Sequence, residues 1–239
     1  MASAYDVVTF DCYGTLIDWE TGIGDAVLSA AAAGGVSLDR AAVLAAYAEI
    51  EPEVQAGQFQ PYRGVLADTA RRIAARFQWP LARDAAGFLA ASLPAWPPFG
   101  DTNPALERLD GAGLRLGILS NVDDDLLEGT RQHFTVPFAL VVTAAQVRSY
   151  KPAPGHFHAA RDRLGGARWL HVAQSWFHDV EPAAALGIAV AWINRKAERG
   201  RGGSRPTVEL RDLAGLADWL GAQTFSVGRV VGRPVLAPW

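Results

Sequence analysis

Short strand-like runs alternate with helix-like segments along most of this sequence of 239 residues, and this alternation limits the possible folds more than any other feature. The apolar, β-branched and aromatic runs that indicate buried strands lie at Tyr5–Phe10, Leu114–Leu119, Phe138–Val142, Trp169–Ala173 and Ile188–Ile193. Helical patterns precede or separate the last four runs, near Pro104–Leu109, Asp124–His133, His156–Leu164 and Pro182–Leu186. Because this order favours right-handed βαβ units, the sequence predicts an α/β fold with a doubly wound, Rossmann-like parallel sheet.

The segment between the first two strand-like runs has helical periodicity only. Glycines and prolines separate it into several helices, with breaks expected at 34–35, 51–52 and 57–61. The proline-rich stretch Leu93–Gly100 is stiff and breaks helices, as a return linker would. We therefore expect a core formed by residues 1–18 and 99–221, an inserted all-helical cap domain with its return linker at 19–98, and a tail of unknown role at 222–239.

Composition excludes several classes of partner. Half of the residues are hydrophobic, which is enough for a sizeable core, and the formal net charge of -3 offers no basic surface for nucleic acid or anionic lipid. Cys12 is the single cysteine, so no intrachain disulfide forms. No apolar stretch is long enough to span a bilayer, and the N-terminus runs directly into strand-like sequence. We expect a cytoplasmic protein that binds neither membranes nor nucleic acid.

Polar clusters follow four of the predicted strands, each at or shortly after the strand's end. They are Asp11–Thr15, Ser120–Asn121, Lys151 and Gln174–Asp179. The carboxyl ends of parallel strands meet at one edge of a sheet, where ligands bind. A carboxylate nucleophile needs a cationic neighbour to stay ionised, hydroxyl and amide groups to orient the substrate, and a second acidic group to position water. The clusters supply all of these groups, so the sequence predicts a site of covalent hydrolysis with Asp11 as the nucleophile.

The clusters also resemble the motifs of a known family. The segments Asp11–Leu16, Leu119–Asn121, Tyr150–Pro152 and Ser175–Gly187 resemble, in order and spacing, the four motifs of the haloacid dehalogenase superfamily. The resemblance runs from about Tyr5 to Arg195. It is nearest to the type II L-2-haloacid dehalogenases, because the first motif reads Asp-X-Tyr-Gly-Thr. This resemblance implies a hydrolase that displaces halide from a small 2-haloalkanoic acid through an aspartyl ester and releases a 2-hydroxy acid.

The resemblance implies a role for each motif residue. Asp11 would attack the carbon that bears the halogen, Lys151 would keep Asp11 ionised, and Asp179 would help to activate water. Thr15 and Ser120 would hydrogen-bond carboxylates. No cofactor and no metal are implied, the partner is a small-molecule carboxylate substrate, and the assembly to expect by analogy is a homodimer.

The substrate pocket departs from the family's pattern at several positions. Phe157 stands where the dehalogenases usually have a tyrosine, and Gln174 and Trp176 stand where they have a serine and an asparagine. We expect the substrate to be bound by these three residues together with Tyr13, Asn121 and a cap arginine, for which Arg63 is our assignment.

A magnesium-dependent phosphatase of the same superfamily is the main alternative. Such enzymes place a second aspartate two residues after the nucleophile, where this chain has Tyr13, and a phenol is too weak an acid for that role. They also carry a Gly-Asp pair after the fourth strand, where this chain has Ala173-Gln174. Mg²⁺ prefers carboxylate oxygens to a neutral amide. Both differences favour attack on carbon over attack on phosphorus, and Mg²⁺ is expected only if the phosphatase alternative holds.

Other interpretations stay open from the sequence. Opening of a strained ring beside a carboxylate needs the same nucleophile and no halide. A catalytically silent binding protein is a further alternative, against which the joint presence of Asp11, Lys151 and Asp179 counts. Asp179 alone also suits a helix N-cap. Asp123–Asp125 is expected to cap the helix that follows it.

Overall fold

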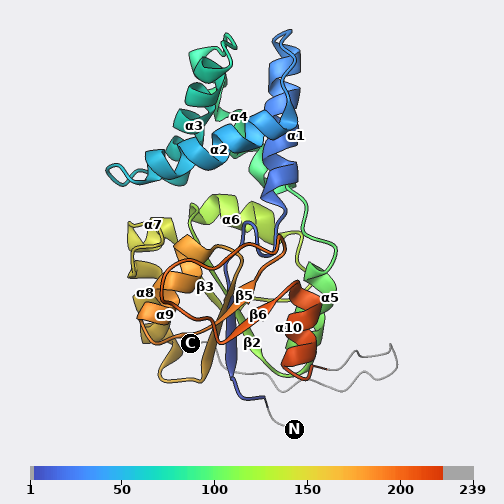
Figure 1. The fold of residues 1–239 in the computed structure, drawn as a ribbon, viewed down its shortest axis with the longest axis vertical. Coiled ribbons are helices and arrows are strands. Elements are labelled where there is room, and N and C mark those ends of the chain that lie inside the picture. The colour runs from blue at the N-terminus through green and yellow to red at the C-terminus, as the bar shows by residue number, and fades with distance from the viewer. Residues whose placement is uncertain (1–2, 223–239) are drawn as a thin grey trace.

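The computed structural model describes residues 3–222, and its centre is a six-stranded parallel sheet (Figure 1). Its strands are β1 (Val7–Phe10), β2 (Arg115–Ser120), β3 (Leu140–Thr143), β4 (Trp169–Ala173), β5 (Ala189–Ile193) and β6 (Val208–Leu210). The order across the sheet is β3-β2-β1-β4-β5-β6, so the first strand lies in the middle between β2 and β4. This is the order of doubly wound Rossmann-like sheets, and it confirms the predicted fold class.

Helices cover both faces of the sheet, as a parallel sheet requires. Helices α5 (Thr102–Gly111) and α10 (Leu213–Trp219) pack together on one side, and α8 (Gly155–Leu164) and α9 (Glu181–Ala185) lie on the other (Figure 1). All of β1 is buried as a result. The remaining core elements are α6 (Asp124–Arg131), α7 (Ala144–Val147) and a one-turn π-helix, η3 (Trp176–Val180).

The predicted strands and helices of the core are all found, with ends that differ by at most a few residues. Strand β6 and helix α10 were not expected from the sequence. The three residues of β6 are too few for an apolar alternation to be recognised in the sequence. They add a last parallel strand to the edge of the sheet beside β5.

Four α-helices and two short 3₁₀ segments form a separate layer above the sheet, at the top of Figure 1. They are α1 (Trp19–Ala33), α2 (Arg40–Gln55), α3 (Tyr62–Arg76), η1 (Arg83–Gly87), α4 (Phe88–Ser92) and η2 (Leu93–Ala95). The expected breaks at 34–35 and 57–61 are present. The break expected at 51–52 is wrong, because α2 continues through Pro52. The buried side chains of Tyr47, Ile50 and Val54 hold this helix against its neighbours, and that packing offsets the hydrogen bond that proline removes.

The two connections between the layers run side by side. The Asp18 amide donates to the Pro97 carbonyl over 2.8 Å, and Ile17 forms an antiparallel bridge with Pro98. We propose these paired segments as the boundaries of the cap, near residues 18–19 and 98–99. The tail predicted at 222–239 lies, apart from its first residue, outside the described residues. Within residues 3–222, no helix is both long and apolar enough to cross a bilayer.

Candidate active site

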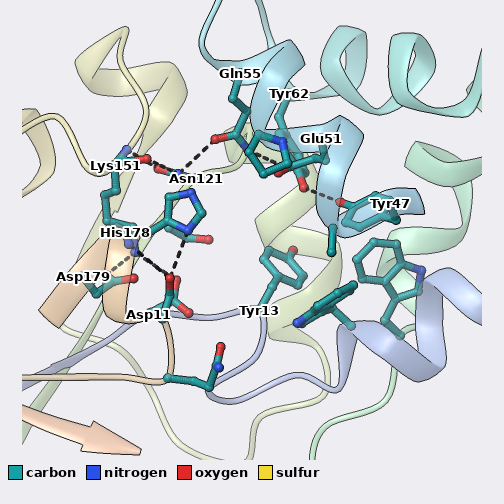
Figure 2. A pocket seen from close by; sticks show the side chains of 17 residues that line it. Asp11, Tyr13, Tyr47, Glu51, Gln55, Tyr62, Asn121, Lys151, His178 and Asp179 are labelled. Carbon is teal, nitrogen blue, oxygen red and sulfur yellow. Dashed lines mark hydrogen bonds and ion pairs between the residues drawn. The ribbon is translucent and has the colours of Figure 1, made fainter. Parts of the chain in front are cut away.

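The strand-end clusters meet at a cavity of about 240 Å³ between the carboxyl edge of the sheet and the helical layer (Figure 2). Its core side is lined by Asp11, Tyr13, Ser120, Asn121, Lys151, Gln174, Ser175, His178 and Asp179. Its cap side is lined by Trp19, Tyr47, Ala48, Glu51, Pro52, Gln55, Tyr62 and Trp96. The cavity is therefore shared between the two layers of the molecule.

Lys151 joins the ends of three strands. Its Nζ donates to Asp11 Oδ1 over 2.9 Å, to Asp179 Oδ1 over 2.6 Å and to the Leu119 carbonyl over 2.8 Å. The lysine is 1% exposed. Burial acts to lower its pKa, but the charges of Asp11 and Asp179 outweigh burial, so the pKa of Lys151 is raised. The site thus holds a permanent ammonium ion beside the predicted nucleophile.

The carboxylate of Asp11 is held on both of its oxygens. Lys151 binds Oδ1, and the Thr15 hydroxyl donates to Oδ2 over 3.0 Å while accepting from the Gln174 amide over 2.9 Å. Burial raises the pKa of Asp11, and the Lys151 charge opposes that rise. The turn after Asp11 depends on Gly14, whose φ of +100° strains any side-chain-bearing residue. These contacts fix the direction in which Asp11 faces the cavity.

Asp179 is surrounded differently. Its Oδ1 accepts from Lys151 and from His171 Nε2, the latter over 2.9 Å. Burial acts to raise the pKa of Asp179, but Lys151 and His171 together lower it. Its Oδ2 is buried and has no hydrogen-bond partner among residues 3–222. Ser175, not Asp179, caps the helical turn by accepting from the His178 amide, so the N-cap interpretation of Asp179 is wrong.

The two residues at the carboxyl end of β2, Ser120 and Asn121, have separate tasks. Ser120 lines the cavity, and its buried Oγ lacks a hydrogen-bond partner in the described part of the chain, so it is available to a substrate. Asn121 binds the backbone of Lys151 twice, accepting from its amide over 2.7 Å and donating to its carbonyl over 3.0 Å. Asn121 also donates to Gln55 of the cap over 3.4 Å. Although Asn121 lines the cavity as predicted, its hydrogen bonds chiefly position Lys151.

Tyr13 and Gln174 also line the cavity as expected. The Tyr13 hydroxyl shares a hydrogen bond of 2.9 Å with Thr130, and its ring contacts Trp96 edge-on. Burial raises the pKa of Tyr13 well above its usual value, so the phenol stays protonated near neutral pH. Tyr13 is consequently unsuited to acid–base chemistry on a leaving group.

The structure does not bring three of the predicted substrate-binding residues to this cavity. The side chain of Arg63 is 52% exposed and pairs with Asp125, because the neighbouring residue of α3, Tyr62, takes the inward direction. Phe157 is fully buried under the sheet against His171. Trp176 packs edge-on against another tryptophan, Trp192. The predictions that these three residues form the substrate pocket are corrected accordingly.

Several groups at the site were missed from the sequence. His171 holds Asp179 from inside β4, and Tyr47, Glu51 and Gln55 line the cap side of the cavity (Figure 2). The cap residues lie four positions apart, and this spacing places them on one face of α2. Polar residues repeated at this spacing in a predicted helix were therefore the sequence signal for a polar helix face that could line the cavity.

Comparison with known proteins shows the family to which this chain belongs. A family model for haloacid dehalogenase-like hydrolases matches residues 5–187. The (S)-2-haloacid dehalogenase H-109 of Pseudomonas putida is 33% identical over 129 residues, which cover 52% of this chain and 57% of that protein. The match with this curated relative thus spans little more than half of its length.

Solved structures share the fold over nearly the whole chain. The crystal structure of the L-2-haloacid dehalogenase RSc1362 superposes with a TM-score of 0.81 at 24% identity, covering 91% of this chain and 99% of that one. The L-2-haloacid dehalogenase of Xanthobacter autotrophicus gives a TM-score of 0.79 at 20% identity, covering 91% and 98%. With the family model matching most of its length, the chain belongs to the haloacid dehalogenase-like hydrolases.

Proposed function

We propose that this hydrolase displaces halide from a small 2-haloalkanoic acid through an ester on Asp11. The observation that carries the proposal is the state of Asp11 at the cavity. Its carboxylate faces the cavity between the Lys151 ammonium and the Thr15 hydroxyl, while the residue two positions later, Tyr13, is a phenol that cannot act as the second acid of a phosphatase. A carboxylate held in this way is suited to attack at carbon.

The proposed reaction has two steps. In the first, an Asp11 oxygen bonds to C2 of the substrate, the carbon–halogen bond breaks, and the halide leaves with its electron pair. The Lys151 ammonium would keep Asp11 ionised, and the free hydroxyl of Ser120 would donate a hydrogen bond to the substrate carboxylate. In the second step, water adds to the carbonyl carbon of the Asp11 ester, and the 2-hydroxy acid departs with the oxygen that Asp11 supplied. The unpartnered Oδ2 of Asp179 would accept a proton from that water and pass it to the departing alkoxide oxygen, and a second proton leaves Asp11 as its carboxylate reforms.

The magnesium-dependent alternative fits these residues poorly. Asp11 and Asp179 are the two carboxylates of the core that line the cavity, and the Lys151 ammonium already bridges them. Gln174 adds a neutral amide where a third carboxylate would be needed. In residues 3–222 no group of three or more histidine, cysteine, aspartate or glutamate side chains is arranged to hold a metal ion. We propose a reaction that depends on no cofactor.

A second candidate is opening of a strained ring beside a carboxylate. It uses the same attack by Asp11, but the leaving oxygen or nitrogen stays attached to the substrate and needs a proton. The observation that favours it is the buried carboxyl group of Glu51 on the opposite wall of the cavity.

Halide release with and without EDTA tests the proposed function. The purified protein is incubated with 2-chloropropionate, fluoroacetate or p-nitrophenyl phosphate. We expect halide release that EDTA does not change and no release of phosphate. Phosphate release that EDTA abolishes would overturn the proposal.

Labelled water tests the ester. In a single turnover in ¹⁸O-water, the product should carry unlabelled oxygen from Asp11, and over many turnovers the label should enter the Asp11 carboxylate. Asp11→Asn should abolish turnover in a sample free of deamidation. Asp162→Asn, the same change at an exposed position of α8, is the matched control and should keep full activity. Label in the single-turnover product would refute nucleophilic attack by Asp11.

A further inference from the structure

The cap side of the cavity carries a buried carboxyl group without a cationic partner. Glu51 is 7% exposed and lines the cavity opposite Asp11 (Figure 2). The Gln55 amide donates to it, and no lysine, arginine or histidine of residues 3–222 forms an ion pair with it. A buried carboxylate with neutral partners only is costly, and a proton removes that cost.

The surroundings of Glu51 favour its protonated form. Burial raises the pKa of Glu51 to about 7, against the opposing effect of hydrogen bonds from Tyr62 and Gln55. The titratable groups that face it are phenols: Tyr47 on its own helix, Tyr62 from α3 and Tyr150 from the core. Burial raises the pKa of all three phenols, so they stay neutral. Glu51 is therefore the group on this wall that can give up a proton near neutral pH.

The direction of displacement places the leaving atom at this wall. Asp11 attacks from the carboxyl edge of the sheet, and in a displacement at carbon the bond that breaks lies opposite the bond that forms. The leaving atom consequently points at the cap, where Glu51, Tyr47 and Gln55 form the lining. Arg63, the residue expected to supply a cation there, instead pairs with Asp125 outside the cavity.

We infer that Glu51 is a further catalytic residue, which donates a proton to the leaving atom, and that the pocket is built for a leaving atom of the first row: fluorine, oxygen or nitrogen. This inference rests on the proposed attack by Asp11. As the Asp11 oxygen bonds to carbon, the bond between carbon and the leaving atom breaks. Its electron pair stays with the leaving atom, which takes the Glu51 proton. Glu51 is left as the carboxylate and regains a proton when water cleaves the ester.

The class of leaving atom follows from basicity. Chloride, bromide and iodide are very weak bases and depart without a proton. Fluoride, and above all an oxygen or nitrogen freed by ring opening, are stronger bases and strong hydrogen-bond acceptors, so proton donation lowers their barrier. General acid catalysis of this kind typically contributes about 10²–10⁴-fold to a rate.

Three substrates with one carboxylate and different leaving atoms test the inference: 2-bromopropionate, 2-fluoropropionate and oxirane-2-carboxylate. Glu51→Gln keeps the shape of the side chain and removes the proton donor. We expect its kcat/KM to fall about 100-fold for the fluoro and oxirane substrates and by less than about threefold for the bromo substrate. Glu53→Gln, the same change on the exposed face of α2, is the matched control and should behave as the wild type.

A pH profile adds a measurement that a structural role would not produce. In the wild type, kcat/KM for 2-fluoropropionate should fall as pH rises through about 7, because Glu51 loses its proton. This fall in kcat/KM should be absent for 2-bromopropionate in the wild type, and absent for 2-fluoropropionate in Glu51→Gln.

The outcomes separate this inference from the proposed function. Equal losses for all three substrates in Glu51→Gln, or bromide release without turnover of either first-row substrate, would overturn the role of Glu51. Turnover of oxirane-2-carboxylate that depends on Glu51, without release of any halide, would support Glu51 and overturn dehalogenation. No turnover of any of the three would overturn both.

Discussion

Asp11 and Asp179 share one cation but have different environments, and the difference bears on the roles proposed for them. Asp11 lies at the cavity with hydrogen bonds to both oxygens, whereas Asp179 keeps one buried oxygen without a partner in the described residues. Lys151 and His171 both bind the other oxygen of Asp179 and lower its pKa. Asp179 is thus the more firmly ionised of the two, and once Asp11 is an ester, Asp179 is the core carboxylate left at the cavity to orient the water and take its proton.

Asp179→Asn should therefore block the second step more than the first. Asparagine keeps the shape of the side chain and cannot accept the proton of water. We expect the ester on Asp11 to accumulate, seen by mass spectrometry of the intact protein as the mass of the substrate less its halide. Steady-state turnover should fall about 100-fold or more. Unchanged turnover, or a large loss without any adduct, would contradict this role.

The burial of Glu51 should also make the free energy of unfolding depend on pH. Burial raises the pKa of Glu51 from 4.5, the usual value for a glutamate, to about 7 in the folded protein, so the folded state binds more protons than the unfolded state between these values. Stability is therefore lost as pH rises from about 4.5 through 7, by about 3 kcal/mol at most. Glu51→Gln lacks this titration. Between pH 4.5 and 7.5 the wild type should therefore lose up to about 3 kcal/mol of unfolding free energy that Glu51→Gln does not lose. A constant difference across this range would show that Glu51 is ionised when folded.

Among the secondary-structure elements, the start of α3 shows how the cap is attached to the core. Asp123 was expected to cap the helix that follows it, but its side chain makes no capping hydrogen bond to α6. It accepts instead from the backbone amides of Tyr62 over 2.8 Å and Arg63 over 2.9 Å. These amides begin α3, which has no cap from its own preceding residue, Pro61. A core carboxylate thus caps a helix of the other layer.

Asp123→Ala should remove this cap and cost about 1–2 kcal/mol of stability, the upper part of the range for a lost N-cap, because two amides at the start of α3 lose their acceptor. Urea denaturation measures the change. Asp125→Ala is the matched control, since Asp125 is exposed and forms only a surface ion pair with Arg63, worth at most about 1 kcal/mol. Equal effects of both substitutions would argue against the cap across the layers.

Across the whole molecule, Lys151 is the link that closes the carboxyl edge of the sheet. It joins Asp11 after β1, the end of β2 and Asp179 after β4, and Asn121 in turn holds its backbone. Breaking a buried ion pair by removing one partner is costly because the remaining charge is left uncompensated. The site and the stability of the core therefore depend on the same residue.

Lys151→Met should lower the unfolding free energy by about 3–5 kcal/mol, because it leaves two buried carboxyl groups without their cation. Adding Asp179→Asn to this variant should restore part of the loss, since one buried charge is then removed. Urea denaturation of the wild type, the two single variants and the double variant completes the cycle. Additive losses in the double variant would contradict electrostatic coupling between Lys151 and Asp179.

Local sequence patterns determined the architecture and the core side of the site. Strand β4 was predicted to the residue, and Asp11, Ser120, Lys151 and Asp179 were expected at one edge because parallel strands end there. Both inferences rest on the order of residues along the chain. The periodicity of apolar residues is a local property that predicts each strand and helix. Once strands alternate with helices, the strands are parallel and their carboxyl ends lie at the same edge of the sheet.

Only the tertiary structure decided the cap side of the site. The sequence placed Arg63 at the substrate and gave no role to its neighbours, whereas the fold turns Tyr62 inward and brings Glu51 across from Asp11. Which face of a helix meets a cavity depends on how that helix is rotated and packed against a separate layer, and a rotation of one residue exchanges one side chain for the next. Packing between distant segments sets that rotation, so the proposed nucleophile could be identified from the sequence, whereas Glu51, the group proposed to face its leaving atom, could not.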